Sequence, residues 1–83
     1  MSTMAIKVLR LLATYGPLDG SSIRRLLGVK HASSVSDVVR RLARHGLVSG
    51  HWLYSLTEKG RAALQFADKC GDLKCLVKEL TST

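Results

Sequence analysis

Glycines that end helices are the feature that most restricts how this chain can fold. Apolar residues recur at helical spacing in "MAIKVLRLLATYG", and Gly16-Pro17 ends that run, because proline disfavours helix in the residue before it. Gly28 is well placed as the left-handed terminator of "SSIRRLLG", and Gly46 ends "SSVSDVVRRLARHG". We therefore expect three short helices before residue 47, the first over roughly residues 3–15.

Polar side chains at the start of the second and third helices can cap them. Asp19 or Ser21 can accept a hydrogen bond from an exposed amide of the second helix, and Ser33 or Ser34 can cap the third. The apolar side chains of the second helix should face inward, namely Ile23, Leu26 and Leu27.

The third helix has two faces of different character. At 100° per residue, one contiguous arc is apolar and consists of Val35, Val38, Val39, Leu42 and Ala43. The opposite arc is polar, rich in arginine, and consists of Ser33, Ser36, Asp37, Arg40, Arg41 and Arg44. We expect the apolar arc to face the core, which leaves the arginine face free to meet a partner.

A short run of strand composition follows the third helix directly. "LVSGHWLYSL" contains a glycine break, which predicts two strands, about 47–49 and 52–56, joined by a tight turn near Gly50-His51. Period-two alternation puts Trp52, Tyr54 and Leu56 on one face. An isolated hairpin is marginally stable, so we expect this one to pack against the helices.

The C-terminal run opens with Thr57 as a helix cap and then has helical spacing. Phe66, Cys70, Leu73, Val77 and Leu80 are spaced 4, 3, 4 and 3 residues apart, which makes a coiled-coil seam over two heptads. Gly71 costs a helix interior about 1 kcal/mol relative to alanine, so either the helix ends there or packing against a partner carries it through. From this seam and the small core we expect a homodimer, with an interface made of Phe66, Cys70, Leu73, Leu76, Val77 and Leu80.

Whether the helix breaks at Gly71 also decides whether the two cysteines can form a disulfide. In an unbroken helix, residues five apart have Cα atoms about 8.7 Å apart, whereas a disulfide requires less than about 7 Å. Cys70 and Cys75 can therefore close a disulfide only if Gly71 breaks the helix. Because intracellular disulfides are unusual, we expect two buried thiols.

The basic excess lies in the first two-thirds of the chain. The formal charge is +7, and residues 1–56 carry eight Lys and Arg against two Asp, or +6. Residues 57–83 carry five basic and four acidic residues, or +1. This distribution is typical of a protein that binds a polyanion.

Other classes of function find little support in the sequence. No apolar stretch reaches the roughly 18 residues that span a bilayer, and the N-terminus lacks a signal-peptide pattern, so we expect a cytoplasmic protein with no membrane partner. The histidines at positions 31, 45 and 51 are scattered and C-x4-C stands alone, so we expect no metal. We find no nucleophile–base pair, phosphate-binding glycine loop or pair of carboxylates in a plausible pocket, and predict no enzyme, no cofactor and no small-molecule substrate.

Four segments of the chain stand in the order of a known DNA-binding architecture. They are "GPLDGSSIRRLLGV", "SSVSDVVRRLARHGLV", "WLYSLT" and "EKGRAAL", and with the first helix they cover about residues 4–65. In this order the chain resembles the winged-helix DNA-binding domains, in particular small transcriptional regulators of the MarR and PadR type. The expected wing is very short and has no Arg or Lys at its tip.

The resemblance implies a winged helix-turn-helix, which is a mainly α fold with a small β-hairpin. A DNA-binding domain would cover residues 1–65. A C-terminal helical segment over residues 66–83, extended from the fourth helix or broken at Gly71, would serve dimerisation.

The same resemblance implies that the third helix enters the major groove of duplex DNA. Its arginines can pair with guanine O6 and N7 or with phosphates, and the serines at its start can donate to phosphates. Asp37 can accept from a cytosine amino group or form a salt bridge with Arg41. The turn before the helix and the wing can reach flanking phosphates. The predicted DNA-binding residues are Lys30, His31, Ser33, Ser34, Ser36, Asp37, Arg40, Arg41, Arg44, Ser49 and His51.

The prediction is thus a sequence-preferring double-stranded DNA-binding protein. It would act as a homodimer and regulate transcription, as a repressor that occupies its site. Two alternatives stay open: an architectural DNA binder with little sequence preference, and a winged helix that serves as a protein-interaction module in a larger assembly. The interaction module requires an exposed apolar patch, whereas the outward arc of the third helix is charged.

Overall fold

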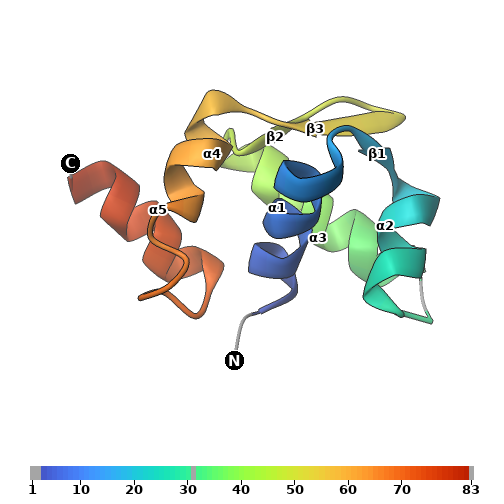
Figure 1. Ribbon diagram of the computed structural model, residues 1–83, viewed down its shortest axis with the longest axis horizontal. Helices are drawn as coiled ribbons and strands as arrows, with labels where there is room; N and C mark the ends of the chain where they lie inside the picture. The colour runs from blue at the N-terminus through green and yellow to red at the C-terminus, as the bar shows by residue number, and fades with distance from the viewer. Residues whose placement is uncertain (1–2, 31, 83) are drawn as a thin grey trace.

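Helix α1 is the element around which the other helices and the sheet are arranged. The computed structural model describes residues 3–30 and 32–82, and Figure 1 shows α1 at the centre of the fold. In chain order the elements are α1 (Met4–Tyr15), β1 (Leu18–Asp19), α2 (Gly20–Leu27), α3 (Ala32–Arg44), β2 (Val48–Ser49), β3 (Leu53–Leu56), α4 (Glu58–Leu64) and α5 (Leu73–Ser82). The described part of the chain is thus mainly helical with a small antiparallel sheet, as the sequence predicts.

The core forms where the other elements meet α1, which contacts α2, α3, α4 and β3. The largest fully buried side chains come from nearly every helix, and they are Ile6, Val8, Leu9, Leu12, Ile23, Leu42, Leu47 and Leu76. Burial of each such side chain contributes about 1.5–3 kcal/mol, so the apolar stripe of α1 stabilises the whole arrangement. Across the described ranges, no helix combines the length and apolar character needed to cross a membrane.

The glycines end the helices as predicted. α1 stops at Tyr15, and Gly16, which follows it, has φ +83°. Gly28 ends α2 with φ 71° and ψ 27°, the left-handed conformation, and Gly46 after α3 has φ 76°. Glycine adopts positive φ without the steric penalty that other residues meet, so these positions fix where the helices stop.

Two details of the helices differ from the prediction. α3 begins at Ala32, so Ser33 and Ser34 lie inside the helix and do not cap it. Leu26 is 47% exposed and Ala43 is also exposed, although both were expected to face the core. Each lies at the edge of its helix's apolar face, where the neighbouring elements do not reach.

The predicted hairpin is joined by a strand that the sequence does not reveal. β2 and β3 pair antiparallel with Val48 opposite Leu56, close to the predicted ranges. β1 pairs antiparallel with the other edge of β3, with Leu18 opposite Tyr54, so the strand order is β1-β3-β2. Trp52 lies in the turn before β3 and is 89% exposed. β3 therefore begins one residue later than predicted, and Trp52 lies outside the strand in which it was expected to share a face with Tyr54 and Leu56.

Thr57 caps α4 as predicted and also ties that helix to the end of α3. Its Oγ1 accepts from the backbone N–H of Gly60 at 3.0 Å and donates to the carbonyl oxygen of Gly46 at 2.6 Å. Gly60 is buried where α4 approaches the chain after α3. A Cβ there would lie 2.2 Å from the carbonyl oxygen of Leu47 and 2.7 Å from Cδ1 of Leu56.

The C-terminal run is not one helix, because α4 ends at Leu64 and α5 begins at Leu73. The alternative of a continuous helix through Gly71 is therefore wrong, and the first helix ends seven residues before that glycine. Cys70 and Cys75 form a disulfide across the break, with their Cα atoms 5.4 Å apart. Asp72 Oδ1 accepts from the backbone N–H of Cys75 at 2.8 Å and so caps α5, while the carbonyl oxygen of Gly71 accepts from the N–H of Thr3 at 3.0 Å. The expectation of two free thiols is wrong, because the break brings the two cysteines within reach of each other.

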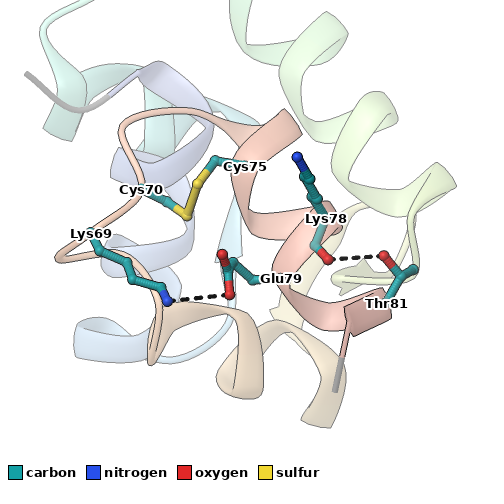
Figure 2. A network of polar contacts seen from close by, with 6 residues as sticks. All are labelled: Lys69, Cys70, Cys75, Lys78, Glu79 and Thr81. Carbon is teal, nitrogen blue, oxygen red and sulfur yellow. Dashed lines mark hydrogen bonds and ion pairs between the residues drawn. A yellow bond between two sulfur atoms is a disulfide. The ribbon is translucent and has the colours of Figure 1, made fainter.

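Polar contacts fasten α5 beside the disulfide. Figure 2 shows the disulfide joining the connecting loop to the first turn of α5, and Lys69 of the loop reaching Glu79 at 3.3 Å. Near the end of the helix, Thr81 Oγ1 donates to the carbonyl oxygen of Lys78 at 2.9 Å. α5 is therefore held to the loop at both its start and its middle.

The residues predicted to form the dimer seam pack largely within their own chain. Cys70, Leu73 and Leu76 are buried, and the half-buried Phe66, Val77 and Leu80 pack against the same core. The break also removes the continuous helix that the seam requires. Cys70, Leu73 and Leu76 are therefore buried within their own chain, and homodimerisation through this segment stays a prediction.

Removal of the disulfide should destabilise the fold. In the chain-entropy account, a bridge between residues five apart contributes about 2 kcal/mol. We expect the double variant Cys70→Ala/Cys75→Ala to lose about 2 kcal/mol of unfolding free energy in urea. Dithiothreitol should weaken the native chain similarly and leave the double variant unchanged. Equal stability of the oxidised chain and the variant would contradict this account.

Gly60→Ala should destabilise the fold because the new methyl group meets the Leu47 carbonyl. Overpacking of this kind costs about 1–3 kcal/mol. Gly20→Ala is the matched control, since a Cβ there would have only Tyr54 Cε2, at 3.9 Å, as a neighbour. We expect the control to change the unfolding free energy by no more than about 1 kcal/mol. Thermal unfolding of both variants provides the measurement, and equal melting temperatures would count against the close approach of α4.

Candidate nucleic-acid interface

The two faces of α3 divide between core and surface as predicted. Val35, Val39 and Leu42 are buried, and Val38 is half-buried. The residues on the opposite face are all exposed, namely Ser33, Ser36, Asp37, Arg40, Arg41 and Arg44. Ser34 is half-buried and lies between the two faces. Most of the predicted contact residues of α3 are thus brought together on one accessible surface.

Among the described residues, none of the three arginines on this face forms an ion pair with a carboxylate. The ion pairs found elsewhere include Arg10 with Asp68 at 3.7 Å and Lys69 with Glu79 at 3.3 Å. Asp37 and Arg41 do not form the salt bridge that their spacing allows. The arginines of α3 are therefore available to an external anion.

Arg41 differs in its surroundings from the other two arginines of α3. It lines a cavity of about 430 Å³ that lies between α1, α3 and α5. The other residues around this cavity are Thr3, Met4, Ala5, Val38, His45, Asp72, Leu73, Lys74 and Val77. Arg40 and Arg44 are one helical turn apart and line none of the three main surface hollows. These two therefore form the part of the face best placed to enter a groove.

Helix α2 contacts α3 and adds two cations that sequence reasoning missed. Arg24 and Arg25 are exposed in the last turn of α2. Arg24 Nη1 lies 3.5 Å from the carbonyl oxygen of Lys30, in the turn between the helices. Lys30 is exposed, as expected for a phosphate contact, and His31 lies outside the described residues. The sequence could have indicated these two cations, because the apolar residues of this helix face inward and the Arg-Arg pair therefore lies on its outer side.

A shallow hollow joins the first turns of α2 and α3. It has a volume of about 320 Å³ and is lined by Gly20, Ser21, Arg24, Val35 and Ser36. Two hydroxyl groups and one guanidinium therefore border the same depression. Hydroxyl and guanidinium groups are common donors to phosphate oxygens.

The β2–β3 turn reaches the same end of the molecule. Ser49 and His51 are exposed, and Ser49 Oγ lies 3.4 Å from Ser55 Oγ across the hairpin. Asp19 of β1, the residue just before α2, stands opposite Leu53 in the sheet. The turn is thus beside the start of α2, and α2 in turn borders the start of α3.

Asp19 is a negative group within this otherwise cationic region. The hydroxyl of Ser22 donates to Asp19 Oδ1, and this hydrogen bond lowers the pKa of the Asp19 carboxyl below its ordinary value. Asp19 is the residue before α2, and its side chain accepts from the hydroxyl of Ser22 in the first turn of that helix. Asp19 and Asp37 are therefore negative charges in this region, and a bound phosphate must lie away from both carboxylates.

The described residues contain no group of three or more His, Cys, Asp or Glu side chains that could hold a metal ion. His45 is half-buried near the end of α3, and His51 is exposed in the hairpin turn.

Comparison with known proteins finds no matching family model, no matching curated protein and no matching solved structure.

Because α3 has one buried and one exposed face, substitutions on the two faces should change the free energy of unfolding by different amounts. Arg40→Ala and Arg44→Ala remove exposed side chains with no ion pair and should change the unfolding free energy by less than about 0.5 kcal/mol. Val39→Ala, on the buried face of the same helix, should lose about 1–3 kcal/mol through the cavity it leaves. Urea denaturation of the three variants provides the test. A large loss in either arginine variant would contradict an outward arginine face.

Proposed function

We propose that this chain is a winged-helix protein that binds double-stranded DNA by placing α3 in the major groove. The observation that supports this most is the exposed, unneutralised row formed by Arg40 and Arg44, with Ser33 and Ser36 toward the start of the same helix. An α-helix fits the major groove, where arginine can pair with guanine O6 and N7. The hydroxyl groups near the helix start can donate to phosphates.

The order of the elements agrees with this proposal. α2 and α3 are consecutive, in contact, and joined by a short turn that begins at Gly28, as in a helix-turn-helix. The β2–β3 hairpin stands where a wing would stand, with β1 completing a three-stranded sheet. In this reading residues 1–65 form the DNA-binding domain, and the C-terminal segment over residues 66–83 serves dimerisation.

The proposed role is regulation of transcription by occupancy of a preferred site, in the cytoplasm. Base-edge contacts from Arg40 and Arg44 would supply the sequence preference. We propose that the protein acts as a homodimer, with the half-buried Phe66, Val77 and Leu80 as the accessible part of the dimer surface. Two-fold symmetry would then require two related half-sites.

A protein-interaction module is the second candidate. Within the part of the chain that the structure describes, four large apolar side chains are exposed, namely Tyr15, Leu26, Trp52 and Leu53. Such side chains can mark a surface that a partner covers. The cations of α3 would then have no role in binding.

Selection of binding sites from random duplexes tests DNA binding, sequence preference and half-site symmetry together. We expect enrichment of a near-palindromic sequence. On that duplex, Arg40→Ala and Arg44→Ala should each weaken binding by about 5- to 150-fold, which corresponds to the loss of a base or charged contact. Arg61→Ala, which removes an exposed arginine of α4, is the matched control and should bind as the native chain does.

Other results of the selection and of the variants would favour a different function. Enrichment without a shared sequence would favour an architectural binder, and a single half-site would remove the dimer. No enrichment, or arginine variants that bind as tightly as the native chain, would overturn the proposal in favour of the interaction module.

A further inference from the structure

Trp52 is the most exposed of the large apolar side chains in the described residues, at 89%. It lies in the β2–β3 turn, one residue before β3 begins. Exposure of an indole to water is unfavourable, because it is the largest apolar side chain and its burial removes a wide surface from water. We propose that Trp52 is a second DNA-contacting residue, which stacks on a base or wedges against a base step beside the groove that α3 enters.

The turn that carries Trp52 has a constrained backbone. Gly50 has φ 114°, and a Cβ at this position would lie 2.0 Å from the carbonyl oxygen of Leu53, so the turn is closed too tightly for any other residue. β3 pairs on both edges, with β1 and with β2, which fixes the base of the hairpin. The indole is therefore presented by a fixed support and does not depend on a loose loop.

The position of Trp52 is continuous with the cationic surface of α3. The next residue, Leu53, stands opposite Asp19, and α2 begins directly after Asp19. The hollow between the first turns of α2 and α3 carries Arg24 and Ser36. A ligand that follows this surface from α3 past the start of α2 reaches the hairpin turn.

The side chains of α3, the start of α2 and the β2–β3 turn indicate what kind of ligand this surface binds. The hairpin tip has no Arg or Lys, so it cannot attract phosphate by charge. An exposed aromatic ring on the hairpin that follows an arginine-bearing helix suits a polymer that carries anionic phosphates outside and flat bases inside. Apolar side chains inserted between base steps unstack and bend a duplex, and every base offers a face for stacking. Duplex DNA that is bound by α3 is therefore the occupant we assign to Trp52, and this inference rests on the proposed function.

Fluorescence of the native chain tests the inference directly, because Trp52 is the only tryptophan in the sequence. The probe is the duplex enriched in the selection experiment, added at fixed salt concentration. We expect saturating duplex to quench Trp52 emission and to protect the indole from iodide. Trp52→Phe should retain most of the affinity, since phenylalanine also stacks, whereas Trp52→Ala should bind about tenfold more weakly. The slope of affinity against salt should stay the same in both variants, since no charge is removed.

The outcomes separate this inference from the proposed function. If the native chain binds the duplex and Arg40→Ala weakens it, but Trp52 emission and the affinity of Trp52→Ala do not change, the inference is wrong and the proposed function stands. If no duplex binds at all, both fail. A blue shift of Trp52 emission with phosphatidylcholine–phosphatidylserine vesicles, without any change on adding duplex, would also overturn the inference and identify a membrane as the occupant.

Discussion

Burial of the valine and leucine face of α3 is the interaction on which the rest of the molecule depends. Val35, Val39 and Leu42 are buried beside α1. Helix α1 in turn contacts α2, α4 and β3 as well as α3. A helix packed along one face must turn the opposite face to water. The direction of Arg40 and Arg44 is therefore a consequence of core packing and needs no contact of their own to maintain it. The same helix thus couples the stability of the fold to the surface that we propose binds DNA.

The small sheet and its connections set how the hairpin stands relative to α3. β3 is held on both edges, and Thr57 joins the start of α4 to the carbonyl of Gly46 at the end of α3. Rotation of the hairpin away from α3 would break these hydrogen bonds. Because side chains on fixed elements can bind without first being ordered, they lose less entropy on binding than side chains on loose loops. A fixed arrangement of α3 and the hairpin therefore favours the contact of both with one duplex that we propose.

Much of the fold could be predicted from the sequence, because its signals are local. Glycines that need positive φ mark the helix ends, and the 100° arc of α3 separates inward from outward residues. β1 could not be predicted, since two residues have no periodicity and their pairing with Tyr54 and Leu53 depends on tertiary contacts. The Cys70–Cys75 disulfide could not be predicted, because spacing alone does not tell whether the helix is broken between the two cysteines and thiols are the usual state inside cells. Trp52 was misplaced for a similar reason: period-two alternation holds only within a strand, and Trp52 precedes one.

The central claim is that the outward face of α3 is the surface that meets DNA. Titration of a short duplex into isotopically labelled protein, followed by amide and arginine side-chain resonances, locates the contact without any substitution. The account predicts that the largest shifts fall on residues 33–44 of α3 and on the Nε–H groups of Arg40 and Arg44, with smaller shifts in residues 49–53 of the hairpin. Shifts confined to α4 and α5, or none at duplex concentrations that saturate other basic DNA-binding domains, would contradict it.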